Sequence, residues 1–116
     1  MLIPEEVHVH LYCGITDMRK SINTLAILVQ EVFGMALETG HLFLFRSRCG
    51  SKLKALYYED FGFTLWYRRL EKGKFIFPRN TQGHIELTKE HFNWLMASNK
   101  YTFHPGEDPA IYLDFH

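Results

Sequence analysis

The sequence is short of cysteine, proline and long apolar runs, and it has no net charge. Its 116 residues include two cysteines and four prolines, and thirteen Lys and Arg balance thirteen Asp and Glu. Cys13 and Cys49 belong to no CxxC motif, which excludes a disulfide framework and a cysteine-based metal site. We interpret them as small buried or turn residues in a reducing compartment, with a single disulfide between them as the alternative.

Targeting and membrane signals are also missing. Residues 1–6 contain no basic region before an apolar run, so we expect no signal peptide. The longest aliphatic run, residues 25–29, is too short to span a bilayer. An apolar content of 47% with 16% aromatic residues indicates a packed globule. We therefore expect a cytoplasmic protein, away from membranes, with a single domain over residues 1–116 and an irregular tail from about residue 100.

Although the chain is neutral, its basic residues are concentrated in the middle of the sequence. Residues 46–79 hold nine of the thirteen Lys and Arg against three acidic residues, a net charge of +6, whereas residues 1–45 and 80–116 each carry −3. The basic segment is also rich in Phe, Trp and Tyr. Such a surface could bind phosphates by charge and stack bases on aromatic rings. The alternative is an ordinary sheet whose outer face carries solubilising charges.

Hydrophobic periodicity predicts a strand, a helix, a run of strands and a second helix. Alternating apolar residues indicate a strand over residues 7–13, and three- and four-residue steps indicate a helix from about Met18 to Phe33. Thr16 or Asp17 is the expected N-cap of this helix, and Gly34 its C-cap. Further strands are expected at residues 42–46, 53–58, 63–70, 75–77 and 82–87, and a second helix, capped by Thr88, at about residues 89–98.

This order of elements predicts an α+β fold. Turn residues between closely spaced strands indicate hairpins, so we expect an antiparallel β-meander of four to six strands with two main helices packed on one face. The other face would then present Arg, Lys and large aromatic side chains together. On the strand at residues 63–70, Thr64, Trp66 and Arg68 share one face, and the odd-numbered residues share the other.

No catalytic or metal-binding motif is complete. Asp60-Phe61-Gly62 matches the magnesium triplet of protein kinases, but no catalytic-loop motif accompanies it. Gly50-Ser51-Lys52 lacks the earlier glycine of a phosphate-binding loop and precedes a strand. Of the seven scattered histidines, His8 and His10 alone have workable ligand spacing. With no nucleophile–base pair or spaced carboxylates, we predict a protein that is not an enzyme and needs no metal or cofactor.

Three sequence blocks resemble a known family. They begin with Cys-Gly-Ile-Thr-Asp-Met-Arg-Lys-Ser at residues 13–21, continue through residues 40–46 and 52–58, and end with residues 66–78. Together they resemble the accessory protein, usually called TnpB, of the insertion-sequence family numbered sixty-six, over about residues 8–88. The sequence departs from relatives by having Ser21 and Thr24 in place of Gly, Cys49 at an often basic position, Phe77 in place of Trp, and an acidic tail.

The resemblance implies a role in transposition of a bacterial insertion sequence, in which a separate, larger transposase carries the catalytic residues. It implies that the accessory protein binds DNA or bridges DNA and transposase. From the charge pattern we predict a nucleic-acid-binding set made of Arg19, Lys20, Arg46, Arg48, Lys52, Lys54, Trp66, Arg68, Arg69, Lys72 and Lys74. The alternative is an adaptor that docks on the transposase, or on a second copy of itself, without contacting DNA.

Overall fold

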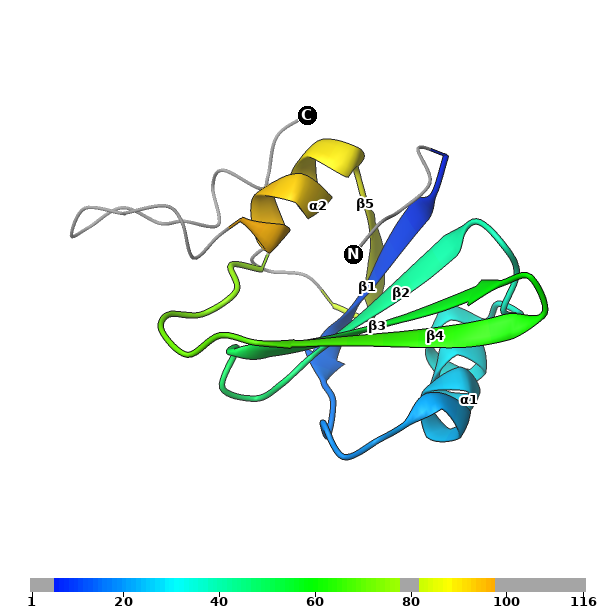
Figure 1. The fold of residues 1–116 in the computed structure, drawn as a ribbon, viewed down its shortest axis with the longest axis horizontal. Helices are drawn as coiled ribbons and strands as arrows, with labels where there is room; N and C mark the ends of the chain where they lie inside the picture. Colours follow the sequence, from blue (N-terminus) through cyan, green and yellow to red (C-terminus); the bar gives the residue numbers. More distant parts are fainter. Residues whose placement is uncertain (1–5, 78–81, 98–116) are drawn as a thin grey trace.

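The described part of the protein folds as one five-stranded sheet with two helices, which confirms the predicted α+β class. The computed structural model describes residues 6–77 and 82–97, so the predicted tail and Arg79 lie outside the described residues. The elements are β1 (His8–Ile15), α1 (Ile22–Phe33), β2 (His41–Arg46), β3 (Lys52–Glu59), β4 (Gly62–Arg69), β5 (His84–Leu87) and α2 (Lys89–Met96) (Figure 1). Across the sheet the strands follow the order β4-β3-β2-β1-β5.

The sheet is mixed, so the prediction of a purely antiparallel meander is wrong. β1 runs parallel to β2, with His8 opposite His41 and Leu11 opposite Leu44. The pairs β2–β3, β3–β4 and β1–β5 are antiparallel. A parallel pair needs a crossover connection, and α1 supplies it. The predicted meander is therefore confined to β2, β3 and β4.

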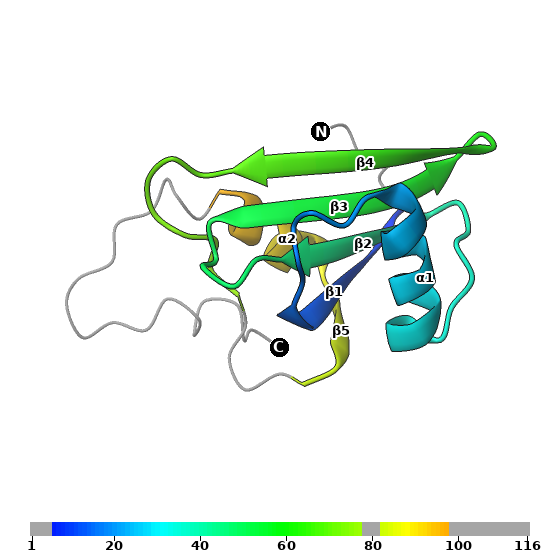
Figure 2. The same cartoon turned by 90° about the horizontal axis from the view of Figure 1, so that it is seen from below.

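The two helices cover opposite faces of the sheet, so the prediction that both pack on one face is wrong. In Figure 2 the sheet separates α1 from α2. The reason lies in β2, where residues 42–45 are all buried and point alternately to the two faces. A strand that is apolar on both sides needs apolar cover on both sides.

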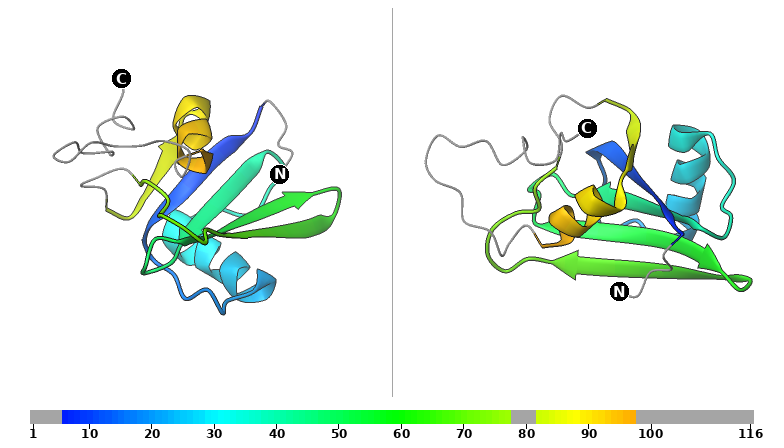
Figure 3. Two further views of the ribbon diagram at one scale, coloured as in Figure 1. Left: turned by 60° about the vertical axis from the view of Figure 1, so that its left-hand side comes forward. Right: turned by 90° about the horizontal axis from the view of Figure 1, so that it is seen from above.

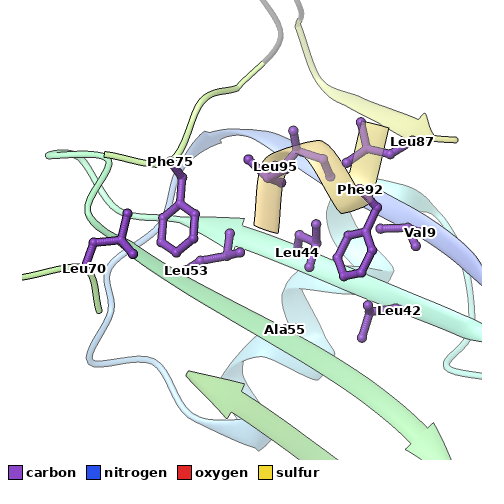
Figure 4. Close-up of a cluster of buried hydrophobic side chains, with 11 residues drawn as sticks. Val9, Leu42, Leu44, Leu53, Ala55, Leu70, Phe75, Leu87, Phe92 and Leu95 are labelled. Carbon is purple, nitrogen blue, oxygen red and sulfur yellow. The ribbon is translucent and has the colours of Figure 1, made fainter. Parts of the chain in front are cut away.

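Each helix contributes a separate cluster to the core. On one face Leu25, Val29 and Phe33 of α1 pack with Phe43, Phe45 and Leu56 of the sheet. On the other face Phe92 and Leu95 of α2 point toward β1 and β2, and Leu70 and Phe75 lie near Leu53 (Figure 4). The predicted strand at residues 75–77 is instead an irregular segment, held by a bond from the Phe75 N–H to the Gly50 carbonyl.

Three local predictions, two helix caps and one hairpin turn, are confirmed. Gly34 ends α1 with a φ of 63°, and Thr88 caps α2 by accepting a bond from the His91 N–H. The hairpin between β3 and β4 turns at Asp60 and Phe61, whose φ values of 50° and 63° suit a two-residue turn of the mirror-image type. The predicted N-cap at Thr16 or Asp17 is wrong, because α1 begins at Ile22 and its N-cap is Ser21. No helix within residues 6–77 and 82–97 is long and apolar enough to cross a membrane.

Candidate nucleic-acid interface

A groove opens beside the end of β1 and the turn between β2 and β3. Its volume is about 660 Å³, and its walls are formed by residues 15–19, residues 47–49 and Lys52. Three of the lining side chains are basic, those of Arg19, Arg48 and Lys52. The groove therefore brings together basic side chains from two segments that lie about thirty residues apart in the sequence.

Asp17 and Arg19 form an ion pair at one wall of the groove. The Arg19 guanidinium donates to both Asp17 carboxylate oxygens, and its Nη2 lies 2.7 Å from Oδ2. These side-chain bonds, followed by a bond from the Arg19 N–H, lower the pKa of Asp17 to about 2. The side-chain bonds and the charge of Asp17 raise the pKa of Arg19. Asp17 is therefore charged and offsets Arg19. Within the described residues, no carboxylate pairs with Arg48 or Lys52.

The positive charge continues from the groove along β3 and β4. Lys52 lies opposite Arg69, and Lys54 lies opposite Tyr67, on the face that carries α1. α1 packs beside the far end of these strands and leaves the Lys52 end uncovered by it (Figure 2). Arg69 is exposed and bonds to Glu71 at 2.9 Å. We call this region the basic surface, and it comprises Arg19, Lys20, Arg48, Lys52, Lys54 and Arg69.

Three members of the predicted set lie on the opposite face and make internal contacts. Arg46 donates from Nε to the Cys13 carbonyl at 3.0 Å, and its guanidinium lies 5.3 Å from the centre of the Phe77 ring. Arg68 donates to the Met96 carbonyl, at the C-terminal end of α2 where helix carbonyls lack intrahelical partners. Trp66 packs against the core cluster beneath α2. Their assignment to DNA binding stays a prediction, but the groove does not include them.

Lys72 and Lys74, the remaining members, are exposed in the turn after β4. The stem of Lys74 lies beside Gly50, in the turn that follows Arg48. This places Lys74 next to the turn that contributes Arg48 to the groove.

Cys49 lines the groove, whereas the sequence predicted only a small buried or turn residue at this position. Its Sγ lies 3.4 Å from the Ser47 hydroxyl and 3.0 Å from the Ser51 hydroxyl. Hydrogen bonds from Ser47 and then Ser51 lower the pKa of this exposed thiol to about 6, with a smaller effect from the charge of Lys52. The Ser-x-Cys-x-Ser spacing was the available signal. Both Cys49 and the buried Cys13 are free thiols.

A stack of histidines lies on the α1 face where β1, β2 and β5 meet. His10 Nε2 lies 2.9 Å from His41 Nδ1, and the His10 ring stacks on Phe43 with centroids 5.0 Å apart. His8 bonds to Glu86 at 3.1 Å. Burial, followed by the nearby His41, lowers the pKa of His10. In the part of the chain that the structure describes, no group of three or more His, Cys, Asp or Glu side chains could hold a metal ion.

Comparison with known proteins identifies the family. Residues 7–103 match the model of the family described as IS66 Orf2 like protein (TnpB_IS66). Two proteins of Sinorhizobium fredii (strain NBRC 101917 / NGR234) are similar in sequence. The uncharacterized protein y4hO is 35% identical over 103 residues, 89% of each chain, and the uncharacterized protein y4jC is 33% identical over 86 residues, 74% of each chain. No solved structure matches the chain significantly. The resemblance seen in the three sequence blocks is confirmed, and the chain belongs to the IS66 Orf2-like family of transposition-associated accessory proteins.

Proposed function

We propose that the chain is a non-catalytic accessory factor for transposition of a bacterial insertion sequence, and that it binds DNA in the cytoplasm through the basic surface. The observation that carries this proposal is the position of Arg48 and Lys52. Both line the groove, and neither pairs with a carboxylate within the described residues. Cations gathered in a hollow attract polyanions more strongly than the same charges spread over a neutral surface. The family's association with transposition supports DNA as the polyanion.

The side chains of the basic surface suit phosphates better than base edges. Lys and Arg contacts to phosphates position a protein on a duplex but carry no sequence information. Tyr67, half-exposed beside Lys54, adds an aromatic ring. Stacking on such a ring tolerates every base, so it does not select a sequence. We therefore expect comparable affinity for different duplex sequences. We also expect this affinity to fall steeply with salt, because each phosphate contact releases about one counterion.

Fluorescence anisotropy of the full chain across a salt series tests the proposal. One duplex carries the terminal inverted repeat of the element, and the other is a scrambled duplex of equal length. Combining Arg48→Gln with Lys52→Gln should weaken binding to both duplexes about tenfold or more and reduce the salt slope by about 2. If the parent binds neither duplex at low salt, or the double variant binds like the parent, the basic surface is not a DNA site.

Two control variants separate the groove from the total charge. Lys89→Gln removes one exposed charge from the start of α2, on the other side of the sheet, and should leave DNA affinity within about twofold. Arg68→Gln removes a charge whose Nη1 bonds to the Met96 carbonyl, so it should affect stability more than DNA affinity. If Lys89→Gln loses as much affinity as the variant that combines Arg48→Gln with Lys52→Gln, the effect is one of total charge and not of the groove.

The transposase of the same element is the protein partner that this function requires. A pull-down of tagged transposase from nuclease-treated extract distinguishes direct contact from bridging by DNA. A complex that survives nuclease treatment supports direct docking. A chain that binds no duplex but still binds the transposase would favour the adaptor over the DNA-binding factor.

A further inference from the structure

Among the residues that the structure describes, the outer edge of β4 is a row of main-chain groups without a neighbouring strand. At one end of the β3–β4 ladder Glu59 pairs with Gly62, and just beyond the other end the Leu70 N–H donates to the Ser51 carbonyl. Hydrogen bonding alternates along an antiparallel pair, so the even-numbered residues of β4 bond to β3. The N–H and C=O groups of the odd-numbered residues, 63 to 69, therefore point away from the sheet. Within the described residues, no strand pairs with them.

Apart from the two arginines at its C-terminal end, this edge lacks the usual features that prevent strand pairing. β4 is eight residues long and contains neither proline nor lysine, and its ladder with β3 is regular from end to end. Figure 3 shows it running along one side of the sheet. Phe61 is 97% exposed, and Phe63 and Tyr67 are 41% and 47% exposed. A long, regular edge strand with exposed aromatic residues is a template for another strand.

The charges at the two ends of β4 select a second copy of the same chain as that strand. Glu59 and Asp60 lie at the hairpin turn, whereas the opposite end of β4 and the turn after it hold four basic residues and one acidic one: Arg68, Arg69, Lys72, Lys74 and Glu71. An antiparallel arrangement of two β4 strands brings the acidic turn of each copy to the basic end of the other. A parallel arrangement would bring like charges together. The sequence of this edge is therefore complementary to itself only in the antiparallel orientation.

The aromatic side chains agree with this orientation. Phe63, Leu65 and Tyr67 share one face of β4, so a two-fold axis at Leu65 places Phe63 of one copy opposite Tyr67 of the second copy. Cross-strand aromatic and opposite-charge pairs both stabilise antiparallel strands. Because the contact is isologous, each such pair occurs twice.

We propose that two copies of the chain associate through antiparallel pairing of their β4 strands, which joins their sheets into one. The partner is a second copy of this chain, and the contact requires neither DNA nor transposase. Arg69 lies at the junction between this edge and the basic surface, so the dimer would bring the two basic surfaces into one assembly.

Sedimentation equilibrium of the full chain without DNA, from about 1 to about 100 μM, tests the proposal. We expect a monomer–dimer equilibrium at low ionic strength. Arg69→Glu should raise the dimer dissociation constant about tenfold, because the changed charge acts twice in the symmetric contact. Added salt should raise the dissociation constant as well, because these charges are exposed to solvent.

Lys89→Glu is the matched control, because it makes the same change of charge on α2, away from β4. It should leave the dissociation constant unchanged, and circular dichroism of each variant verifies the fold. The proposal is overturned if the parent stays monomeric up to about 100 μM. It is also overturned if Arg69→Glu dimerises like the parent, if Lys89→Glu weakens the dimer as much as Arg69→Glu, or if added salt strengthens the dimer.

Discussion

The ammonium group of Lys54 donates a hydrogen bond to the carbonyl oxygen of Lys20, 2.6 Å away. Lys54 lies on β3, and Lys20 lies just before α1, so the bond fastens the segment that forms one wall of the groove to the sheet. The same ammonium lies 5.5 Å from the centre of the Tyr67 ring. Lys54, which the charge pattern predicts as a DNA contact, therefore also stabilises one wall of the groove.

Replacing Lys54 should cost stability, whereas replacing its neighbour on the same face should not. Lys54→Met removes a charged hydrogen bond and a cation–π contact, so we expect the free energy of unfolding to fall by about 1–2 kcal/mol. Lys52→Met should change it by less than about 0.5 kcal/mol, because no bond from the Lys52 ammonium joins it to another described residue. Urea denaturation followed by circular dichroism measures both. Equal losses in the two variants would contradict a structural role for the bond to Lys20.

Some local features of the fold could be predicted from the sequence, and the long-range ones could not. Gly34 and Thr88 act as caps because their chemistry is local, and the Asp60-Phe61 turn follows from the gap between two strand patterns. The parallel pairing of β1 with β2 is different. Period-two alternation is the same in parallel and antiparallel strands, so the pattern shows a strand but not the direction of its partner. The crossover through α1 is what allows β1 and β2 to run parallel.

The candidate site could be predicted only in part, because it also depends on long-range packing. The concentration of charge in residues 46–79 is a property of the sequence, but its division between two faces depends on the helices. Because α2 covers one face, Arg68 bonds to that helix, while Lys52 and Arg69 stay on the face where the groove lies. The groove itself needs residues 15–19 beside residues 47–49, a contact that follows from the parallel β1–β2 pair.

The two helix N-caps differ in a way that stability measurements can detect. Thr88 accepts a bond from the His91 N–H at 3.1 Å, whereas Ser21 makes no side-chain capping bond to α1. Thr88→Ala should therefore lower the free energy of unfolding by about 1 kcal/mol, and Ser21→Ala by a few tenths at most. Urea denaturation of both variants tests this, and a larger loss in Ser21→Ala would show that the cap assignment is wrong.

The histidine stack should make the fold less stable in acid. In the unfolded chain His10 titrates at its ordinary pKa of 6.5, whereas burial and then His41 lower its pKa in the folded state, partly opposed by Glu86. Below pH 6.5 the unfolded state therefore binds a proton that the folded state does not. The stabilising contribution of neutral His10 is fully present above 6.5 and is lost as the pH falls toward the lowered folded-state pKa. His8 and His84 also lower the pKa of His10.

Comparing urea denaturation at about pH 7.5 and about pH 5.5 measures this dependence. The parent should be less stable at the lower pH. His10→Gln, which cannot titrate, should show a smaller difference between the two conditions. If His10→Gln loses as much stability in acid as the parent, another group is responsible.

Cys49 should react as a thiolate near neutral pH. With a pKa of about 6, its rate of alkylation by iodoacetamide should level off above about pH 7, whereas an ordinary thiol with a pKa of about 8.5 would keep accelerating. Mass spectrometry of the labelled peptide measures the rate and separates it from that of buried Cys13. Ser51→Ala should shift the titration upward, because it removes one of the two hydroxyl donors. Ser47 is less suitable for this test, since its hydroxyl also accepts a bond from the Lys52 N–H.

The same thiol reports on the groove. Cys49 lines it together with Arg48 and Lys52, so a duplex bound there should shield Cys49 from alkylation. Saturating duplex should slow labelling of the parent several-fold, while iodoacetamide, being neutral, is not itself attracted or repelled by the local charge. In the variant that combines Arg48→Gln with Lys52→Gln, the same duplex concentration should give little protection, because the phosphate contacts are lost. Unchanged labelling of the parent when anisotropy shows the duplex fully bound would place the DNA on a surface other than the groove.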